Sequence, residues 1–310
     1  MAHVTVISLV IATRDRALRL NNSLSYTRAI DTRMEWELIV VDNGSVDRTP
    51  DILREFVPSV SYPVTIMTEP IPGLGRAHNR GWRAAKGEIV AFTDDDCYVL
   101  PDFIDQAAAV FDDSKIGYCG GRIKLHDPSD YPITINESTQ PEFFPPRSYL
   151  EAGAIQGANM MFRRQTLEEI GGFDPSLGPG TPFNCEDVDA CARASFAGWW
   201  GAYAPGPTVL HAHGRKTAEA AALWRRYAIG RGAYAAKFIL RRDTRRSYLC
   251  AWRRQLAAHL KGISGGRRAC FYEIEGAIWY WAHRISATSI CTSSCSGSQS
   301  RLRGRRSLRD

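Results

Sequence analysis

The sequence lacks the features that mark a membrane-spanning or secreted protein. Its 310 residues contain no run of about 18 consecutive apolar residues, the length that a transmembrane helix needs. The apolar segment 4–12 is short, follows no basic residues and precedes no small-residue cleavage site. We therefore interpret it as a buried strand and not as a signal peptide. These absences lead us to expect a cytoplasmic protein.

Several common ligand-binding motifs are missing as well. None of the eight cysteines forms a CxxC pair, which argues against a zinc site, and we expect most of them to be buried apolar side chains. No GxGxxG follows the first apolar run, and no Gly-Lys-Ser or Gly-Lys-Thr follows the glycine-bearing turn at 73–75. Neither a dinucleotide fingerprint nor a Walker loop is therefore present.

Charge is not scarce but is unevenly distributed. The net charge of +6 combines residues 1–210, which hold 18 Lys and Arg against 28 Asp and Glu, with residues 211–310, which hold 21 against 5. The body is thus acidic and the C-terminal third strongly basic, which suggests a negatively charged surface as the partner of that third.

Strand and helix patterns alternate through the first hundred residues. Apolar runs predict strands at 4–11, 37–41, 64–67 and 88–93, and helical patterns lie at 15–30, 46–57, 76–86 and 101–112. This alternation predicts an α/β fold, with a mainly parallel open sheet flanked by helices. Further on, the patterns predict a flexible loop at 127–146, a strand at 157–163, a helix at 186–197, and two short strands at 199–203 and 208–210.

The C-terminal third follows a different pattern. Helical patterns at 217–240, 247–261 and 268–285 predict a helical extension, and a Ser/Arg-rich segment from 286 onward is expected to be disordered.

Polar residues follow three of the predicted strands. Asp42 follows the second, three aspartates (Asp94, Asp95 and Asp96) follow the fourth, and segment 13–16 follows the first. Ligands of open α/β sheets bind at the carboxyl ends of the strands. Three successive aspartates repel one another, so a bound Mg²⁺ or Mn²⁺ shared with phosphates is one explanation, and capping of the following turn is the other.

Three further segments carry candidate groups. The turn at 73–75 enters a helix and either offers backbone N–H groups to a diphosphate or is a plain turn. Glu186 and Asp187 begin a predicted helix. Either the helix dipole stabilises their negative charges there, or one of them serves as a general base. His211 and His213 share one face of a strand and are either metal ligands or structural.

Taken in order, these segments resemble the family 2 glycosyltransferases with the GT-A fold. The resemblance covers about residues 4–214, and its pieces are SLVIATRDRA, VDNGSVDRT, EPIPGLGRAHNRGWRAAKGEIVAFTDDDC, GANMMFRR, GGFDPSLG, EDVDACAR and VLHAHG.

The resemblance implies a fold, a domain division and an activity. It implies a GT-A catalytic domain at 1–214, with a nucleotide-sugar half at about 1–97 and an acceptor half at about 98–214, followed by the extension at 215–285 and the tail at 286–310. The implied activity is inverting transfer of a sugar from a nucleotide-diphosphate donor to a hydroxyl of a polysaccharide or a lipid-linked glycan precursor.

The resemblance also implies roles for individual residues. Asp94, Asp96 and His211 would hold Mg²⁺ or Mn²⁺, with His213 as the competitor of His211 and with the share of Asp95 left open. Asp187 would be the catalytic base beside Glu186, and the acceptor would meet Glu186 and Asn159. The residues implied for the nucleotide sugar are Thr13, Asp15, Arg16, Asp42, Gly75, Arg76, Asn79, Asp94 and Asp95.

The sequence departs from the family pattern at three positions. Ala12 stands where the family often has Pro, Asp15 where it often has Asn, and His78 where it often has Arg or Lys. The change at His78 removes a cation from the segment that is implied to meet the diphosphate.

The basic extension lies outside the family motifs. Its paired arginines alternate with aromatic residues and precede the cluster at 278–281, a composition that suits an interfacial helix on an anionic membrane. A helical cap that packs its aromatics on the catalytic domain is the alternative, and nucleic acid is not expected because the body is acidic.

Two other functions compete with glycosyl transfer. A sugar-nucleotide nucleotidyltransferase would carry a Gly-rich, Lys/Arg-bearing loop after the first strand, where this sequence has ATRDRALRL. A non-catalytic carbohydrate-binding protein would not need the acidic cluster, the Glu-Asp pair and the histidine together.

Overall fold

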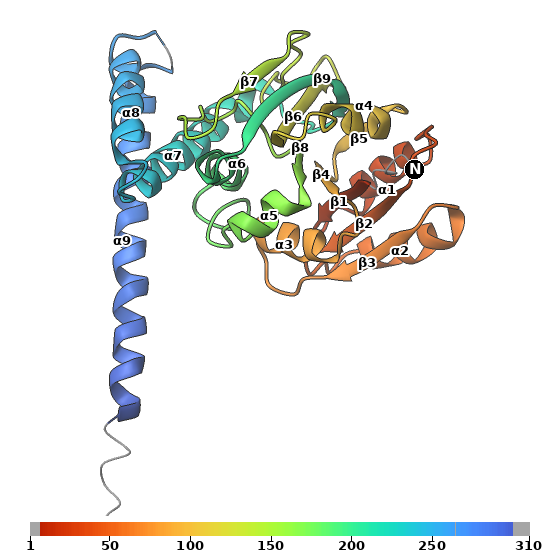
Figure 1. Ribbon diagram of the computed structural model, residues 1–310, viewed down its shortest axis with the longest axis horizontal. Helices are drawn as coiled ribbons and strands as arrows, with labels where there is room; N and C mark the ends of the chain where they lie inside the picture. Colours follow the sequence, from red (N-terminus) through yellow and green to blue (C-terminus); the bar gives the residue numbers. More distant parts are fainter. Residues whose placement is uncertain (1–6, 264, 300–310) are drawn as a thin grey trace, which may run out of the picture. The chain divides into compact units, whose positions relative to one another are not determined.

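The computed structural model describes residues 7–263 and 265–299, and the chain divides into two compact units, Met1–Tyr227 and Ala228–Asp310 (Figure 1). The first unit is α/β and the second is helical. The boundary lies after Tyr227, later than the expected end of the catalytic domain at Gly214, because the first turns of a long helix belong to the first unit.

A nine-stranded sheet forms the centre of the first unit. Its order is β3-β2-β1-β4-β8-β6-β9-β5, with β7 paired to β9. The strands are β1 (Ile7–Thr13), β2 (Trp36–Asp42), β3 (Val64–Thr68), β4 (Ile89–Asp94), β5 (Cys97–Val99), β6 (Ile116–Leu125), β7 (Glu142–Phe144), β8 (Asn159–Arg163) and β9 (Trp200–His211).

The two halves of the sheet differ in strand direction. Strands β1 to β4 are all parallel, as the alternating pattern predicts, whereas β8 runs antiparallel to both β4 and β6, and β5 and β7 run antiparallel to β9. A parallel neighbour needs a long crossover that is usually helical, and the chain between β6 and β8 contains no helix. The first half of the sheet is thus parallel as expected, and the second half is mixed, since β6 and β9 are also parallel to each other.

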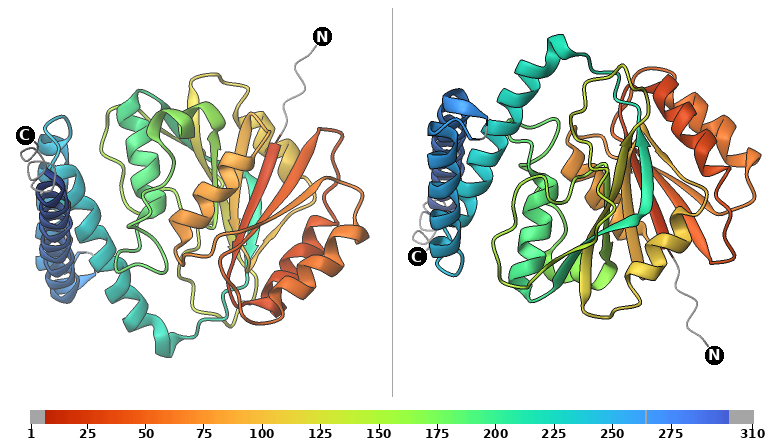
Figure 2. Two further views of the ribbon diagram at one scale, coloured as in Figure 1. Left: turned by 90° about the horizontal axis from the view of Figure 1, so that it is seen from below. Right: turned by 90° about the horizontal axis from the view of Figure 1, so that it is seen from above.

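Helices cover both faces of the sheet. They are α1 (Ala17–Thr27), α2 (Thr49–Phe56), α3 (Leu74–Ala84), α4 (Phe103–Val110), α5 (Arg164–Ile170) and α6 (Glu186–Ala197). Successive side chains of a strand point to opposite faces. Leu9 and Val40 accordingly share a buried cluster with Leu20 of α1, whereas Val10 and Val41 face Gly81 of α3. Figure 2 shows α1 and α2 on one side of the sheet and α5 and α6 on the other.

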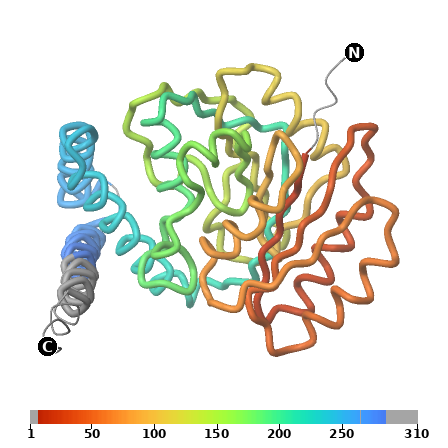
Figure 3. Tube along the Cα trace, turned by 60° about the horizontal axis from the view of Figure 1, so that its bottom comes forward, coloured from red at the N-terminus to blue at the C-terminus, as the bar shows by residue number. Residues whose placement is uncertain are grey.

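One late strand replaces two expected short ones. The patterns at 199–203 and 208–210 belong to the single strand β9, which pairs with both β6 and β5 (Figure 3). The ladder with β6 shifts register between Gly121 and Arg122, opposite the segment 204–208. A bulge accommodates Pro205 and Pro207, which cannot donate to a ladder, so the strand continues past them.

The second unit consists of helices. It holds the later part of α7 (Ala220–Ile239), α8 (Arg245–Leu260) and α9 (Gly266–Gln299), as the helical patterns predict. A Cβ atom at Gly232 would collide with the carbonyl oxygen of Glu273, and one at Gly276 with that of Ile229, so α7 and α9 approach at their backbones.

The carboxyl group of Glu273 lies fully buried in the second unit. It accepts hydrogen bonds from Trp252 and Gln255 and pairs with Arg231 at 2.7 Å and His259 at 3.0 Å. These partners stabilise a charge that would otherwise be costly to bury. The unit therefore has a polar core of its own and is more than a single amphipathic helix.

Helix α9 continues past the expected boundary at 286. It extends to Gln299 because a helix, once formed, adds residues at low cost even where they are Ser-rich. The remainder of the tail that we expect to be disordered, 300–310, lies outside the described residues.

Candidate active site

The carboxyl ends of β1, β2 and β4 bring polar groups to one edge of the sheet. In the strand register Thr13 lies opposite Asp42, and Ala12 lies opposite Asp94. The strand-end groups thus meet in space, as the sequence predicts.

Four potential metal ligands converge at this edge. One ligand atom each from Asp94, Asp96, Cys97 and His211 lies within 4.8 Å of all the others. Burial and the neighbouring Asp94 and Asp96 raise the pKa of the Cys97 thiol well above its ordinary value, so it stays protonated. Two carboxylates and one imidazole remain as donors, a set that suits Mn²⁺ or Mg²⁺ when phosphate oxygens complete the coordination.

Two arginines at the start of α1 hold the acidic cluster in place: Arg16, directly before the helix, and Arg19 in its first turn. Arg16 pairs with Asp95 at 3.0 Å and with Asp96 at 2.9 Å. Arg19 pairs with Asp96 at 2.9 Å and also donates to the carbonyl oxygen of His213 at 2.9 Å. Sequence reasoning missed Arg19, although it lies only three residues after Arg16.

The three aspartates have different surroundings. Asp95 accepts from the hydroxyl of Thr13 at 2.7 Å and from Arg16, which turns it away from the histidine. Asp96 lies 3.4 Å from the imidazole Nε2 of His211. Asp94 and Asp96 are therefore the two carboxylates that lie close to the histidine, whereas Asp95 accepts hydrogen bonds from Thr13 and Arg16.

Protonation differs along the same run. Burial and the charge of Asp96 raise the pKa of Asp94 to about 6. Burial likewise raises the pKa of Asp95 to about 6, against the charge of Arg16. Burial would also raise the pKa of Asp96, but the hydrogen bond and charge of His211 and the two arginines lower it well below its usual range.

The two histidines of the strand end have separate partners. His211 meets Asp96, and its Nδ1 lies 3.4 Å from the hydroxyl of Thr134. His213 lies 3.7 Å from Asp130, and its Nδ1 accepts from the backbone N–H of Arg215. Of the two, His211 is the one placed to ligate a metal with Asp96.

The loops after β1 and β2 are joined at Asp15 and Asp42. Asp15 has a positive φ of 52°; its N–H donates to the hydroxyl of Ser45, and its carboxylate accepts from the N–H of Val46. The buried Asp42 accepts from the N–H of Ser45. Both carboxylates thus shape the loops around the strand ends.

The glycine-bearing turn and the helix that it opens pack on the loop after α5. Gly75 lies in the first turn of α3, where a Cβ would come within 2.9 Å of the carbonyl oxygen of Asp174. The buried amide of Asn79 donates to the carbonyl oxygen of Phe173 and accepts from the N–H of Phe173 and from Trp82. Asn79 therefore clamps the loop after α5.

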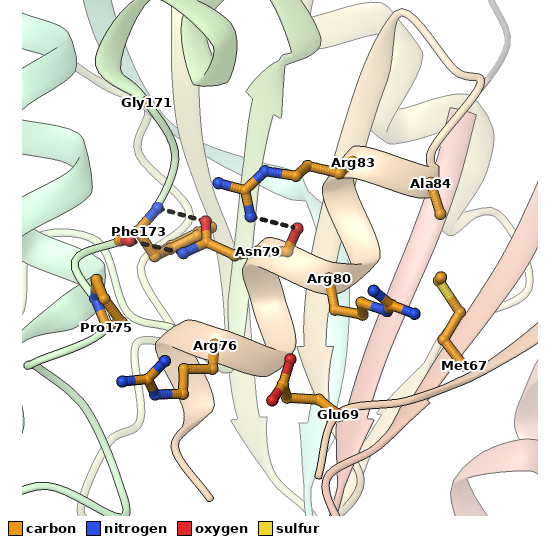
Figure 4. A pocket seen from close by; sticks show the side chains of 10 residues that line it. All are labelled: Met67, Glu69, Arg76, Asn79, Arg80, Arg83, Ala84, Gly171, Phe173 and Pro175. Atoms are coloured by element: carbon orange, nitrogen blue, oxygen red, sulfur yellow. Dashed lines mark hydrogen bonds between the residues drawn. The ribbon is translucent and has the colours of Figure 1, made fainter. Parts of the chain in front are cut away.

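Two neighbours of that turn have different surroundings. His78 is fully buried between Phe92 and Phe173, and burial lowers its pKa to about 3, so it is neutral and supplies no cation, as its departure from the family pattern predicts. Arg76 lines a pocket beside α3, and its guanidinium points away from Glu69 (Figure 4).

The carboxyl pair at the start of α6 consists of Glu186 and Asp187. Asp187 accepts from the N–H of Gly157 at 2.9 Å and of Val188 at 2.7 Å, bonds that favour its ionised form although burial raises its pKa. Burial, followed by the charge of Asp187, raises the pKa of Glu186 well above its ordinary value. Burial thus raises the pKa of both carboxyl groups, and the two backbone N–H groups oppose this rise at Asp187.

A glycine that sequence reasoning did not single out packs on this pair. Gly178 has a φ of +98°, and a Cβ there would come within 2.8 Å of the carboxyl carbon of Glu186. The close approach explains why the segment GGFDPSLG must end in glycine at this point.

Asn159 is placed differently from the acceptor role implied for it. Its side chain is fully buried at the start of β8, and its amide donates to the carbonyl oxygens of Arg122 and Pro207. It joins three strands where the β9 bulge occurs, which is a structural position.

The sequence matches the model of a known protein family. The family model described as glycosyl transferase family 2 matches residues 8–171, just over half of the chain. The chain belongs to glycosyl transferase family 2. The resemblance drawn from its motifs is thereby confirmed.

Relatives with glycosyltransferase names are identical to this family 2 protein at about a quarter of the aligned positions. EpsH of Bacillus subtilis is 28% identical over 171 residues, which cover 52% of this chain and 48% of EpsH. AglE of Haloferax volcanii is 23% identical over 194 residues, 62% of each chain. The family 2 chain therefore spans only about half to three fifths of the length of these relatives.

Solved structures confirm the GT-A fold. The mannosyltransferase PcManGT of Pyrobaculum calidifontis, in complex with GDP-Man and Mn²⁺, aligns with a TM-score of 0.65 at 20% identity, over 97% of this chain and 81% of that one. TarS residues 1–349 of S. aureus, in complex with UDP-GlcNAc, align with a TM-score of 0.56 at 17% identity, over 84% and 74%.

Proposed function

We propose that this glycosyltransferase transfers a sugar, with inversion, from a nucleotide-diphosphate donor to a hydroxyl group of its acceptor. The observation that carries the proposal is the convergence of Asp94, Asp96 and His211 at the carboxyl ends of the strands, a donor set that suits a divalent cation. The carboxyl pair at the start of α6 lies within electrostatic reach of this cluster, since the charge of Asp94 contributes to the raised pKa of Glu186.

The acidic cluster would hold the nucleotide-sugar donor. Asp94, Asp96 and His211 would bind Mg²⁺ or Mn²⁺, and Arg16 would lie beside the diphosphate. Once bound, the cation would stabilise the charge that develops on the departing nucleoside diphosphate. Asp15 and Asp42 shape the loops in which the nucleoside would lie.

The carboxyl pair would activate the acceptor. The oxygen of the acceptor hydroxyl attacks the anomeric carbon while its proton passes to Asp187, and the bond from that carbon to the diphosphate breaks on the opposite face. Asp187 can take the proton because two backbone N–H groups favour its ionised form and orient it. Glu186, in its protonated form, would donate a hydrogen bond to another oxygen of the acceptor.

The test is a panel of nucleotide sugars. Release of nucleoside diphosphate from one donor, with Mn²⁺ or Mg²⁺ but not with EDTA, is the expected result. Release of pyrophosphate from a sugar phosphate and a nucleoside triphosphate would instead identify a nucleotidyltransferase. Binding without any turnover, in the presence of a range of glycan acceptors, would identify a carbohydrate-binding protein.

The helical unit suggests where the acceptor is found. Phe271, Ile274 and Ile278 lie on one face of α9 with 68%, 38% and 58% of their surface exposed, and the exposed Arg267 and Arg268 precede them. An exposed apolar stripe beside arginines suits an anionic membrane surface. We propose that this face brings the enzyme to a lipid-linked glycan or to a polysaccharide that is assembled at the membrane.

Vesicle binding tests this localisation. Within the described residues no helix combines the length and hydropathy that crossing a bilayer requires. The expected binding is therefore peripheral, to phosphatidylglycerol vesicles and not to phosphatidylcholine vesicles. The Ile278→Glu variant should weaken it, and Val46→Glu, at a 91% exposed position of the first unit, should not. Absence of binding to anionic vesicles at low salt would refute the proposal.

A further inference from the structure

A pocket of about 480 Å³ lies beside α3 (Figure 4), and none of the residues that line it belongs to the acidic cluster. Its walls come from the end of β3, the outer face of α3 and the loop after α5. Three arginines project from α3 into its lining at positions 76, 80 and 83, a spacing that places them on one face of the helix. Met67, Phe173 and Pro175 supply apolar wall.

The positive charge of this α3 arginine pocket is not balanced from within. Among the described residues the side chains of Arg76 and Arg80 form no hydrogen bond or ion pair, and the Arg83 guanidinium donates to the carbonyl oxygen of Asn79 and lies over the ring of Trp82. Glu69 is the one carboxylate of the lining, and it accepts from the N–H of Ile71. The pocket therefore carries a net positive charge.

The position of Arg76 supports an external counter-charge. It lies in the first turn of α3, where the helix dipole disfavours a cation and favours an anion. The three guanidinium groups point to different parts of the pocket lining (Figure 4), and in the part of the chain that the structure describes none of them pairs with a carboxylate. An anion bound in the pocket would supply that counter-charge, and planar guanidinium groups match phosphate oxygens well.

We propose that the α3 arginine pocket binds a phosphate group that is distinct from the donor's metal-bound diphosphate. Its ligand class is a phosphate monoester or diester whose organic part lies against Met67, Phe173 and Pro175. If the proposed glycosyl transfer holds, a phosphate of the acceptor is one source and free phosphate is the other. The binding itself does not depend on that activity.

The location makes the pocket relevant to the acceptor. The loop after α5 that forms one wall is clamped by Asn79 at Phe173, and the same segment reaches Gly178, which packs on Glu186. A phosphate held by the arginines would thus bind against the segment that borders the carboxylate pair.

Binding of inorganic phosphate and of glycerol 3-phosphate, measured by calorimetry in EDTA, tests the proposal. We expect binding that Arg80→Ala weakens about fivefold, that Arg80→Glu abolishes and that Arg80→Lys largely retains, since a charge-assisted hydrogen bond is lost in the first two. Arg33→Ala removes an exposed arginine elsewhere and should leave the affinity unchanged.

Asp96→Ala separates this pocket from the metal cluster. We expect it to leave phosphate binding in EDTA intact. Loss of that binding in Asp96→Ala, equal affinities of Arg80→Glu and wild type, or no binding of either probe in EDTA would overturn the proposal. Tighter binding of glycerol 3-phosphate than of inorganic phosphate indicates an organic ligand, and equal binding indicates free phosphate. Neither outcome depends on turnover, so failure here is distinguishable from failure of the proposed activity.

Discussion

Replacement of Asp187 by asparagine should abolish transfer far more than it destabilises the protein. The substitution removes the group that would accept the proton of the acceptor hydroxyl, and loss of a general base typically lowers the rate by about 10²–10⁴-fold. That corresponds to about 3–5 kcal/mol of transition-state stabilisation.

The structural cost of the same change can be worked out from its contacts. Both carboxylate oxygens of Asp187 accept backbone N–H groups, from Gly157 and Val188. An asparagine can accept only one of them through its oxygen, and its NH₂ faces the other donor. One unsatisfied buried N–H costs about 1–3 kcal/mol, so the variant should fold with a lowered Tm.

Asp189→Asn is the matched control on the same helix. Asp189 pairs with Arg193 at 2.8 Å and is fully buried. Breaking a buried ion pair costs about 3–5 kcal/mol, so this variant should be the less stable of the two. It should nevertheless keep its turnover per folded molecule.

Turnover and nucleotide-sugar affinity test the assignment of the base. They are measured under conditions in which circular dichroism shows that both variants are folded. We expect kcat to collapse only in Asp187→Asn, with donor affinity nearly unchanged. Turnover close to wild type in Asp187→Asn, or an equal loss in Asp189→Asn, would refute the assignment of the base.

Three further predictions concern pH, a glycine and the helical unit. Because burial raises the pKa of Asp187 and a base acts only when ionised, kcat/KM should fall with decreasing pH through a pKa above that of a free aspartate; an acid limb at or below the free value would contradict this. Gly178→Ala should lower both Tm and turnover, since its Cβ would strike Glu186, whereas Gly171→Ala, also at positive φ but facing open space, should lower Tm alone. Glu273→Leu should destabilise the helical unit by about 3–5 kcal/mol in urea unfolding, because Arg231 loses its buried partner; an unchanged midpoint would show that the network contributes nothing.

The part of the fold that could be predicted from the sequence is the part that local hydrophobic periodicity encodes. The alternation of apolar runs and helical patterns predicts the parallel half of the sheet, because each βαβ unit is encoded within a short stretch of chain. It also predicts that Asp42 and Asp94 meet at one edge. The antiparallel pairings of β8, β5 and β7 depend on partners distant in sequence, which no local pattern reveals.

The different roles of neighbouring side chains could not be predicted either, because they too depend on contacts with residues distant in sequence. Asp94, Asp95 and Asp96 are equivalent in the motif, and it is the contacts of Arg16, Arg19 and His211 that distinguish them. These contacts arise from α1 and from β9, far apart in the chain.

Asn79 shows the opposite case, in which a motif residue has a structural task. The family resemblance implies a diphosphate contact, whereas in the structure the amide bonds to Phe173 and Trp82 and so fixes the loop after α5. Only the position of the loop after α5, which the tertiary fold determines, reveals this.

The most direct test of the account is a Mn²⁺ titration of the wild type and of Asp96→Ala, with and without UDP and GDP, followed by electron paramagnetic resonance. We expect the wild type to bind Mn²⁺, and its preferred nucleotide to strengthen this binding. Asp96→Ala should remain folded but lose both the Mn²⁺ binding and its strengthening by nucleotide. Equal Mn²⁺ and nucleotide binding by the two proteins would contradict the claim that Asp94, Asp96 and His211 form the donor's metal site.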